Sequence, residues 1–336
     1  MFQKNISLKP YNTFGIEVKA DRFISISSLA QLMDIISQEK DIFLLSGGSN
    51  ILLTKNITKP VIHINLKGIE IIEDPKEKNS VLIKVQSGEN WHEFVLWCIA
   101  NDFGGIENLS LIPGNVGTSP MQNIGAYGVE IKDVFHELEA IEIATNQIKK
   151  FNKNSCNFGY RESIFKNSEK NKYIIITVTF KLTKNTHKLN TSYGAIQNEL
   201  HANNVKNPTI NDVSNAVIAI RNSKLPDPKK IGNCGSFFKN PILSSKQYAI
   251  LKQEYPEIPS YYISDELIKV PAGWLVEQCG FKGKRFGDAG VHKNQALVLV
   301  NYNNATGMEI FELAQKILKS VRQKFNIDLE IEVNIF

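Results

Sequence analysis

One uncharged, glycine-rich stretch, from Pro113 to Gly128, limits most what this chain can fold into. It holds four glycines in sixteen residues, interleaved with amide and hydroxyl side chains, and no charged residue occurs between Glu107 and Glu130. Because glycine has no Cβ, the backbone of such a stretch can approach another object closely. Uncharged amides and hydroxyls supply donors and acceptors along the same path. The pattern favours a backbone wrapped around a large, flat, hydrogen-bonding ligand.

The alternative is a flexible polar loop. Solvated linkers are rich in small and polar residues and lack apolar or rigid side chains that anchor them to a core. This stretch contains five such anchors, namely Pro113, Pro120, Met121, Ile124 and Tyr127. They argue for an ordered segment.

The size and composition of the chain indicate a globular protein of two or three domains. The chain has 336 residues, of which 42% are hydrophobic, so there is material for substantial cores. It contains no run of 18 apolar residues, so we expect no membrane span. The segment from Met1 to Ser7 lacks the apolar region of a signal peptide, and we expect none.

The cysteines and histidines form no pattern typical of a metal site. The four cysteines are scattered without a CxxC pair, and the six histidines form no cluster, so we expect no metal. Scattered cysteines are typical of a reducing compartment, and we expect a cytoplasmic protein without disulfides.

The net charge of +5 and the pI of about 8.8 come from lysines spread over Lys/Asn-rich segments. A nucleic-acid partner would require a basic stripe interleaved with aromatic residues, and the sequence has none. A mild positive field favours anionic small substrates.

Hydrophobic periodicity predicts strands and helices in mixed order, which indicates an α+β fold. Ser27 or Ser28 is expected to cap one helix, and Thr306 with Glu309 forms a capping box before another. The expected strands are 22–26, 43–45, 61–65, 81–85, 138–143 and 173–182, and the expected helices are 29–36, 91–100, a helix beginning at 211 or 212, 271–283 and 305–325. In the helix at 271–283, Trp274 and Leu275 are expected in the core.

The loop from Ser46 to Asn50 follows a predicted strand but is not a Rossmann fingerprint. That motif needs GxGxxG at the start of a helix, whereas here the third glycine is missing and the apolar tripeptide 51–53 follows. Consecutive small residues can still aim backbone N–H groups at an anion. An ordinary turn between strands is the alternative.

The last eight residues, Leu329 to Phe336, alternate strictly between apolar and polar side chains, which predicts one strand. Glu330 and Glu332 then point the same way, roughly 6.6 Å apart along the strand. An acid at Glu332 could assist proton transfer beneath a cleft. The alternative is a glutamate that faces solvent on an edge strand.

Three further side chains could carry chemistry. Ser236 lies between a glycine and two phenylalanines without the GxSxG pattern, so a proton donor fits better than a nucleophile, and a turn hydroxyl is the alternative. Arg161 lies among aromatic residues and suits a carboxylate or an enolate oxygen, unless it is structural and packs on Tyr160. Lys224 precedes a proline-rich turn and suits a phosphate contact, or is a plain surface lysine.

Taken together, six segments resemble the UDP-N-acetylenolpyruvoylglucosamine reductase family, whose members are also called UDP-N-acetylmuramate dehydrogenases. They follow the family order from near residue 10 to the C-terminus, and several are long. The segments are Asn12–Gly15, Gly48–Asn50, Ile112–Gly128, Tyr160–Ser163, Gly232–Pro241 and Leu329–Val333.

The resemblance implies an FAD-binding fold of the vanillyl-alcohol-oxidase type in two subdomains, with a C-terminal α+β domain that binds the substrate. We expect the subdomains at residues 1–65 and 66–205 and the substrate-binding domain at 206–336, its last strand returning to the active site. The implied activity is the NADPH-dependent, FAD-mediated reduction of UDP-N-acetylglucosamine enolpyruvate to UDP-N-acetylmuramate, in the synthesis of peptidoglycan precursors. The implied small-molecule partner is therefore a UDP-sugar, and we expect a monomer.

The resemblance also assigns roles to individual residues. Ser236 matches the proton donor at C2 of the substrate, and Arg161 and Glu332 match the pair that stabilises the enolate. Tyr193 matches the tyrosine of a mobile loop that closes over substrate in the longer-chain, type I members. The implied contacts to the substrate diphosphate and nucleotide are Lys224, Asn240, Lys282 and Gln295. The implied FAD-binding residues are Gly47, Gly48, Ser49, Asn50, Pro113, Gly114, Gly117, Thr118, Ser119, Gln122, Asn123, Gly125, Ala126 and Tyr127.

The chain departs from the family pattern near its C-terminus, where Ile331 and Asn334 replace a frequent proline and arginine.

Two other functions share some of these features. One is a flavin oxidoreductase of the same fold with another substrate, and the other is a non-catalytic nucleotide-binding protein. The combination of Ser236, Arg161 and Glu332 argues against both.

Overall fold

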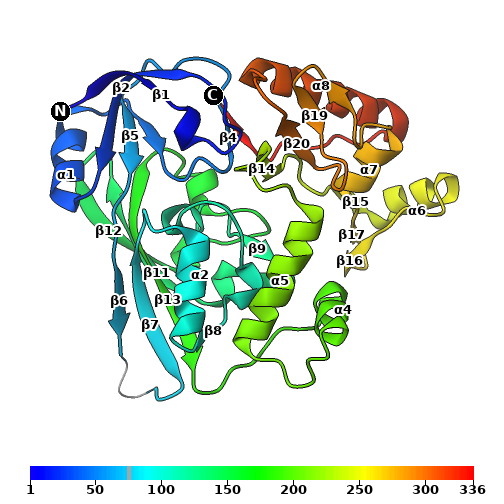
Figure 1. Cartoon of the computed structure of the whole chain (residues 1–336), viewed down its shortest axis with the longest axis horizontal. Helices are drawn as coiled ribbons and strands as arrows, with labels where there is room; N and C mark the ends of the chain where they lie inside the picture. Colours follow the sequence, from blue (N-terminus) through cyan, green and yellow to red (C-terminus); the bar gives the residue numbers. More distant parts are fainter. Residues whose placement is uncertain (74–76) are drawn as a thin grey trace. The chain divides into compact units, whose positions relative to one another are not determined.

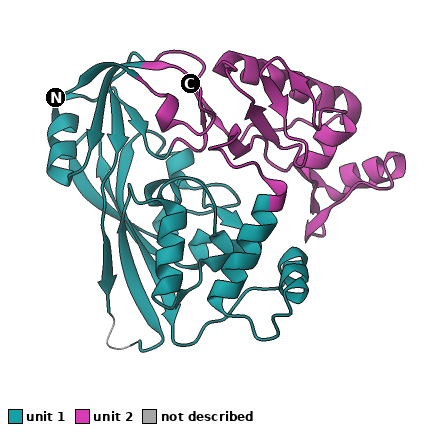
Figure 2. Cartoon of the chain, viewed as in Figure 1, with its two compact units in different colours: residues 1–6, 20–47, 57–222 teal, residues 7–19, 48–56, 223–336 magenta. Residues whose placement is uncertain are grey.

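The computed structural model describes residues 1–73 and 77–336, and these form two compact units (Figure 2). Unit 1 comprises residues 1–6, 20–47 and 57–222, and unit 2 comprises residues 7–19, 48–56 and 223–336. The short N-terminal pieces of unit 2 are thus far in sequence from its main part. The predicted division at residues 65 and 205 is finer than these units and stays a prediction.

The first sheet of unit 1 has the strand order β1–β2–β5–β3. Strands β2 and β3 both pair with β5 in parallel. The strands are β1 (Gln3–Ser7), β2 (Lys19–Ile26), β5 (Val61–Ile64) and β3 (Phe43–Leu45). Helix α1 (Leu29–Gln38) begins after Ser28, whose hydroxyl accepts a hydrogen bond from the backbone N–H of Gln31 at 3.3 Å. The predicted serine cap is confirmed.

The second sheet of unit 1 is antiparallel, with the order β12–β11–β13–β7–β6, and β8 also pairs with β13. Its central strand, β13, is buried on both faces. Ile174 and Ile176 pack with α1 and the first sheet, and Val178 and Phe180 pack with α2. The strands are β12 (Gln147–Asn152), β11 (Phe135–Glu142), β13 (Tyr173–Lys184), β7 (Ser80–Gln86), β6 (Ile69–Ile72) and β8 (Phe103–Gly104). Unit 1 is therefore built in layers, with β13 in the middle.

The remaining elements of unit 1 lie beside this second sheet. Helix α2 (Trp91–Ala100) has the predicted bounds, and Trp91 and Phe94 are buried beneath it. Helix α5 (Ile210–Lys224) begins one residue earlier than predicted, because the Thr209 hydroxyl accepts a hydrogen bond from the Asp212 N–H. The other elements are η2 (Glu107–Leu109), η3 (Val116–Thr118), β9 (Gly125–Ala126), β10 (Val129–Glu130), η4 (Ile131–Asp133), α3 (Lys153–Cys156), η5 (Ile164–Lys166) and α4 (Gly194–Ala202).

Unit 2 contains an antiparallel sheet of order β14–β20–β19–β18, covered by helix α8 (Gly307–Phe325) (Figure 1). The predicted capping box of α8 is present, since Thr306 and Glu309 each accept the other's backbone N–H. Its apolar face, which includes Ile317 and Val321, is buried. The strands of this sheet are β14 (Gly232–Ser236), β20 (Val298–Asn301), β19 (Ala289–Val291) and β18 (Arg285–Phe286).

A second small sheet of unit 2 has the order β15–β17–β16 and is also antiparallel. Its strands are β15 (Ile242–Ser244), β17 (Leu267–Lys269) and β16 (Tyr261–Ser264). The other helices of unit 2 are η1 (Lys9–Tyr11), α6 (Ser245–Glu254) and α7 (Ala272–Gln278). Helix α7 is shorter than predicted, and Trp274 is only half buried, whereas Leu275 is in the core as expected. The mixture of antiparallel sheets and separate helices confirms the α+β class.

The C-terminal segment corrects the prediction of one eight-residue strand. Only β21 (Asn334–Ile335) is a strand, and it pairs in parallel with β4 (Ile51–Leu52). Before it, Ile331 forms a single antiparallel bridge with Phe238. The burial still alternates, with Leu329 and Val333 buried, but the segment changes partner midway, so no continuous ladder forms. Across residues 1–73 and 77–336, no helix is long and apolar enough to span a membrane.

Candidate active site

In unit 1, Arg161 lies at the tip of a tight turn. Gly159 and Glu162 exchange two backbone hydrogen bonds, of 3.0 and 3.3 Å, across this turn. Arg161 has a φ of +56°, in the left-handed region, where a side chain other than that of glycine costs about 1–2 kcal/mol. Such strain persists only where surrounding contacts hold it, and it is frequent at functional sites.

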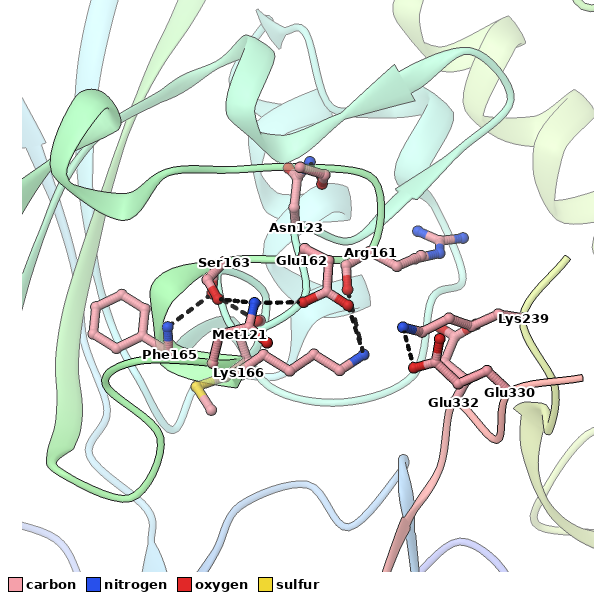
Figure 3. Close-up of polar contacts among 12 residues, drawn as sticks. Met121, Asn123, Arg161, Glu162, Ser163, Phe165, Lys166, Lys239, Glu330 and Glu332 are labelled. Carbon is pink, nitrogen blue, oxygen red and sulfur yellow. Dashed lines mark hydrogen bonds and ion pairs between the residues drawn. The ribbon is translucent and has the colours of Figure 1, made fainter. Parts of the chain in front are cut away.

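Two side-chain hydrogen bonds fasten this turn to the glycine-rich stretch, and Figure 3 labels Ser163, Met121 and Asn123, which take part in them. The Ser163 hydroxyl donates to the backbone oxygen of Met121 at 2.7 Å, and the Asn123 amide donates to that of Gly159 at 3.0 Å. Asn123 is fully buried and also bonds to Glu130 and to the Lys132 N–H. The stretch therefore positions Arg161, a role that its sequence did not indicate.

Several glycines of the stretch are required by packing of the chain on itself. A Cβ on Gly117 would lie 2.4 Å from the Cβ of Ser87, and one on Gly125 would lie 2.9 Å from the backbone oxygen of Val129. The hydroxyls of Thr118 and Ser119 donate to backbone oxygens within the stretch. The interpretation of a backbone wrapped around a ligand is therefore incomplete, because these residues also hold the stretch in its own shape.

The backbone strain of the described residues is concentrated in this part of unit 1. Apart from glycine, asparagine and aspartate, the described residues with positive φ are Leu111, Tyr127 and Arg161. The Leu111 N–H donates to Nδ1 of His92 at 3.0 Å, and burial lowers the pKa of His92, which keeps this ring nitrogen a neutral acceptor. Three strained residues in one unit make this region a candidate functional site.

Sequence reasoning missed a partly buried cation in the same unit, Arg221 on α5. Its Nε is buried without a hydrogen-bond partner among the described residues, and its guanidinium forms a hydrogen bond with the Tyr127 side chain. Burial, followed by the nearby charge of Arg161, lowers the pKa of Arg221. A buried guanidinium with an unsatisfied donor, close to a second arginine, suits an anionic ligand. Burial was the signal that could have identified it, and burial is not visible in the sequence.

In unit 2, Ser236 is exposed at the end of β14 because the strand bulges just before it. The register of β14 against β20 shifts between Asn233 and Ser236, and Gly235 takes a φ of +73°. The Asn233 side chain accepts the Gly235 N–H at 3.0 Å and holds the bulge. Phe237 and Phe238, which follow, are fully buried, so the serine is anchored on one side by core packing.

Glu332 lies beside this segment in unit 2. Its backbone N–H donates to the Phe237 oxygen at 2.9 Å, and its backbone oxygen accepts from the Asn50 side chain at 3.3 Å. The Glu332 charge, after burial, raises the pKa of the Cys234 thiol, which places its carboxylate near Cys234. The structure therefore brings Ser236 and Glu332 onto adjacent backbone segments.

The neighbours of Glu332 have separate partners. Lys239 pairs with Glu330 at 2.5 Å, and the Lys239 N–H donates to the Glu330 backbone oxygen at 2.9 Å (Figure 3). The Asn334 side chain, at the position where the family often has arginine, donates to the Asn50 backbone oxygen at 3.1 Å. Asn334 thus helps to fix the segment that carries Glu332.

Unit 2 also contains a pocket of about 330 Å³. Three of the residues predicted to contact the substrate line it together, namely Asn240, Lys282 and Gln295. The other lining residues, which sequence reasoning did not assign to the site, are Tyr261, Pro271, Gly273, Trp274, Glu277, Asn294, Ala296 and Leu297. Two aromatic rings and three amides suit a nucleobase or a sugar, and Lys282 pairs with Glu277 at 2.8 Å.

The other predicted substrate residues lie elsewhere. Lys224 is exposed at the end of α5 and does not line the pocket. Tyr193 belongs to unit 1, where its ring packs edge-on against Tyr127 at 5.2 Å. Among the predicted FAD-binding residues, Gly48, Ser49 and Asn50 belong to unit 2, and Gly47 and those of the glycine-rich stretch belong to unit 1.

Comparisons with known proteins agree with this arrangement. An FAD-binding domain family matches residues 23–152, and the C-terminal domain of UDP-N-acetylenolpyruvoylglucosamine reductase matches residues 227–336. The reductase of that name from Flavobacterium johnsoniae is 59% identical over 99% of both chains. Those from Amoebophilus asiaticus and Pseudomonas fluorescens are 48% and 45% identical over 99% of this chain and 98% of theirs.

The fold agrees as well. The crystal structure of the UDP-N-acetylenolpyruvylglucosamine reductase from Thermus caldophilus matches all of both chains with a TM-score of 0.69 at 20% identity. The predicted combination of an FAD-binding fold with a C-terminal α+β domain is confirmed. The chain belongs to the UDP-N-acetylenolpyruvoylglucosamine reductase family.

Proposed function

We propose that this protein reduces the enolpyruvyl group of UDP-N-acetylglucosamine enolpyruvate, with FAD as its cofactor and NADPH as reductant. Family membership supports the reaction, and FAD and NADPH are consistent with the family. The observation that carries the assignment in this chain is in unit 2. Ser236 is exposed at a bulge, and the residue after it, Phe237, accepts a backbone hydrogen bond from Glu332. A serine and a glutamate on adjacent segments are the combination that the family's chemistry requires.

The residues present fit FAD. The buried Nε of Arg221 lacks a partner among the described residues, and a buried guanidinium of this kind suits the anionic groups of a dinucleotide. The uncharged stretch, which contains Tyr127, offers amides and backbone groups in the part of the chain that matches FAD-binding domains. FAD, when bound and reduced by NADPH, would supply the hydride that the enolpyruvyl double bond accepts.

Ser236 donates the proton that the substrate needs at C2. Its hydroxyl is exposed, and its backbone is fixed between the Gly235 bulge and the buried Phe237. A positioned donor is effective because the proton transfer needs no further reorganisation of the protein. Serine is a weak acid in water, so the step depends on negative charge that develops at C2 next to the substrate carboxylate.

Arg161 and Glu332 stabilise that developing charge. The strained turn presents the Arg161 guanidinium, which suits a carboxylate or an enolate oxygen. Glu332 is fixed through its backbone to Phe237 and Asn50, so the position from which its side chain extends is defined. Its carboxyl group stabilises the developing negative charge as the protonated acid, which can donate a hydrogen bond to the enolate. Groups positioned before the reaction stabilise charge as it develops, which is usually the largest catalytic contribution.

The pocket of unit 2 holds the nucleotide portion of the substrate. Asn240, Lys282 and Gln295 supply polar contacts, and Tyr261 and Trp274 supply aromatic surface. Lys224 and Tyr193 contact the diphosphate, the latter from a loop that closes over substrate. We further propose that the protein is a monomer in the cytoplasm, and the four free cysteines are consistent with this compartment.

The experiment that tests this function follows the visible absorption of the flavin under anaerobic conditions. NADPH is added first and is expected to bleach the band, and UDP-N-acetylglucosamine enolpyruvate is then expected to restore it. Bleaching without recovery would retain a flavin-dependent oxidoreductase but reject this substrate. Purified protein that neither contains nor binds flavin would contradict the proposed cofactor.

A further inference from the structure

The first turn of α7 forms one wall of the pocket in unit 2. The residue before the helix, Pro271, offers no side-chain cap, and the side chain of Asn240 takes that place. The Asn240 Oδ1 accepts the Ala272 N–H at 2.9 Å. This bond fixes the orientation of the amide, because its oxygen is committed to the helix. The Nδ2 group is left as the donor available to a ligand.

Gln295 lines the same pocket and is oriented in a similar way. Its Oε1 accepts the Leu297 N–H at 3.3 Å. The same oxygen lies 2.9 Å from the position that a Cβ on Gly273 would occupy. The amide oxygen of Gln295 therefore fills the space that the missing side chain of Gly273 leaves. Its Nε2 group is then the donor available to a ligand.

Nothing in the backbone of α7 requires glycine at position 273. Gly273 is not among the described glycines with positive φ, and it lies in the first turn of the helix. Glycine in a helix costs about 0.5–1 kcal/mol relative to alanine. The nearest obstacle to a Cβ is the Gln295 Oε1, and the next is the Leu297 Cγ at 3.4 Å, an ordinary contact distance. The side chain of Gln295 is thus the physical reason for this glycine.

We propose that Gly273 is a positioning residue for nucleotide binding, because it leaves room for the Gln295 amide to present its NH₂ group to the ligand. Together with Asn240, this gives the pocket two amide donors whose oxygens are already committed. Two such donors match a ligand part rich in acceptors, such as the carbonyl groups of uracil or the oxygens of a diphosphate. The inference rests on the proposed function, since it names UDP as the group that the pocket holds.

The test is the affinity of the flavin-loaded enzyme for UDP, measured by titration calorimetry. Gly273→Ala is expected to weaken UDP binding about tenfold, the loss of about one hydrogen bond. Its melting temperature should be equal or higher, because alanine replaces glycine in a helix. Gly194→Ala is the control for helix stability. An added Cβ there has no neighbour within 4 Å, so its change in melting temperature shows how much alanine stabilises a helix when no contact is disturbed.

The double variant shows whether Gly273 acts through Gln295. Gln295→Ala alone is expected to weaken UDP binding to a similar extent, and adding Gly273→Ala to it should cause no further loss. The double variant also removes the steric conflict, so it remains informative if Gly273→Ala alone does not fold. The inference would be overturned if Gly273→Ala weakened UDP binding equally in the unmodified enzyme and in Gln295→Ala. It would also be overturned if Gln295→Ala bound UDP with full affinity.

Failure of the inference can be told apart from failure of the proposed function. If the unmodified enzyme does not bind UDP, the nucleotide assignment of the pocket is wrong, and the role of Gly273 is wrong with it. If it binds UDP and Gly273→Ala binds equally well, only the role of Gly273 is wrong.

Discussion

The two units place their proposed catalytic residues on irregular backbone by different means. In unit 1, a non-glycine residue, Arg161, takes the strained conformation, and side-chain hydrogen bonds from Asn123 and Ser163 hold its turn. In unit 2, Gly235 takes the positive φ, and the Asn233 side chain two residues before it holds the bulge together with main-chain bonds to neighbouring segments. The arginine therefore depends on side-chain hydrogen bonds to a segment distant in sequence, whereas the serine depends on one glycine, an adjacent asparagine and the sheet.

The largest expected effect comes from removing the proton donor itself. Ser236→Ala should lower turnover of the enolpyruvyl substrate by about 10²–10⁴-fold, the range of a general acid. Reduction of the flavin by NADPH should continue, and the melting temperature should change little because the side chain is exposed. Stopped-flow measurements separate the two half-reactions. Full turnover in this variant would remove Ser236 from the mechanism.

The dependence of unit 1 on side chains can be tested at Asn123. Asn123→Ala should lower the free energy of unfolding by about 2–4 kcal/mol, because the fully buried amide is lost and partly buried backbone groups of Gly159 and Lys132 lose their partners. Urea denaturation measures this, and turnover should fall as the Arg161 turn loosens.

Asn157→Ala is the matched control. Asn157 and Asn123 have φ values of +44° and +45°, but Asn157 is exposed. Its replacement should therefore cost only the backbone strain, about 1 kcal/mol. Equal losses in both variants would mean that the hydrogen bonds of Asn123 do not hold the turn.

The dependence of unit 2 on one glycine can be tested at Gly235. An added Cβ there has no neighbour within 4 Å, so Gly235→Ala should cost only strain, about 1–2 kcal/mol. Relief of this strain moves Ser236, and turnover should fall roughly tenfold. Gly287→Ala has a similar φ of +63° away from the site and should lose similar stability with normal turnover. Normal turnover in both variants would show that the bulge does not position Ser236.

The smallest expected effect is a pH dependence in unit 1 that arises from His92. Burial lowers the pKa of His92 below 6.5, so protonation favours the unfolded chain. The contribution of the neutral His92 ring to the free energy of unfolding is fully present above pH 6.5. It is lost as the pH falls from 6.5 through the lower pKa of the folded state. His92→Asn should flatten this part of the curve of unfolding free energy against pH, while the exposed His201→Asn should leave it unchanged. An unchanged curve in His92→Asn would contradict this origin.

Much of the fold could be predicted because it depends on local patterns. The Ser28 cap, the capping box of α8 and the bounds of α2 follow from side chains within a few residues of one another. The C-terminal strand was predicted wrongly, because alternation describes which side chains are buried but not which segment they pair with.

The candidate site divides in the same way. Resemblance in sequence pointed to Ser236, Arg161 and Glu332, and to the pocket residues Asn240 and Gln295, since motifs keep the identity of such residues. No motif indicated Arg221, because its importance lies in burial and in the Tyr127 and Arg161 side chains around it.

The sequence by itself determined the family, the chemical character of the site and most element positions, because each is written in neighbouring residues. Only the tertiary structure decided how the residues are held. In the folded chain, Asn123 holds the Arg161 turn by a hydrogen bond, and a bulge exposes Ser236. The side-chain amide of Gln295, 22 positions along the chain, occupies the space that a side chain at Gly273 would need. These contacts join segments that are distant along the chain, and the free energy that fixes them arises from packing and hydrogen bonds that form only when the chain folds.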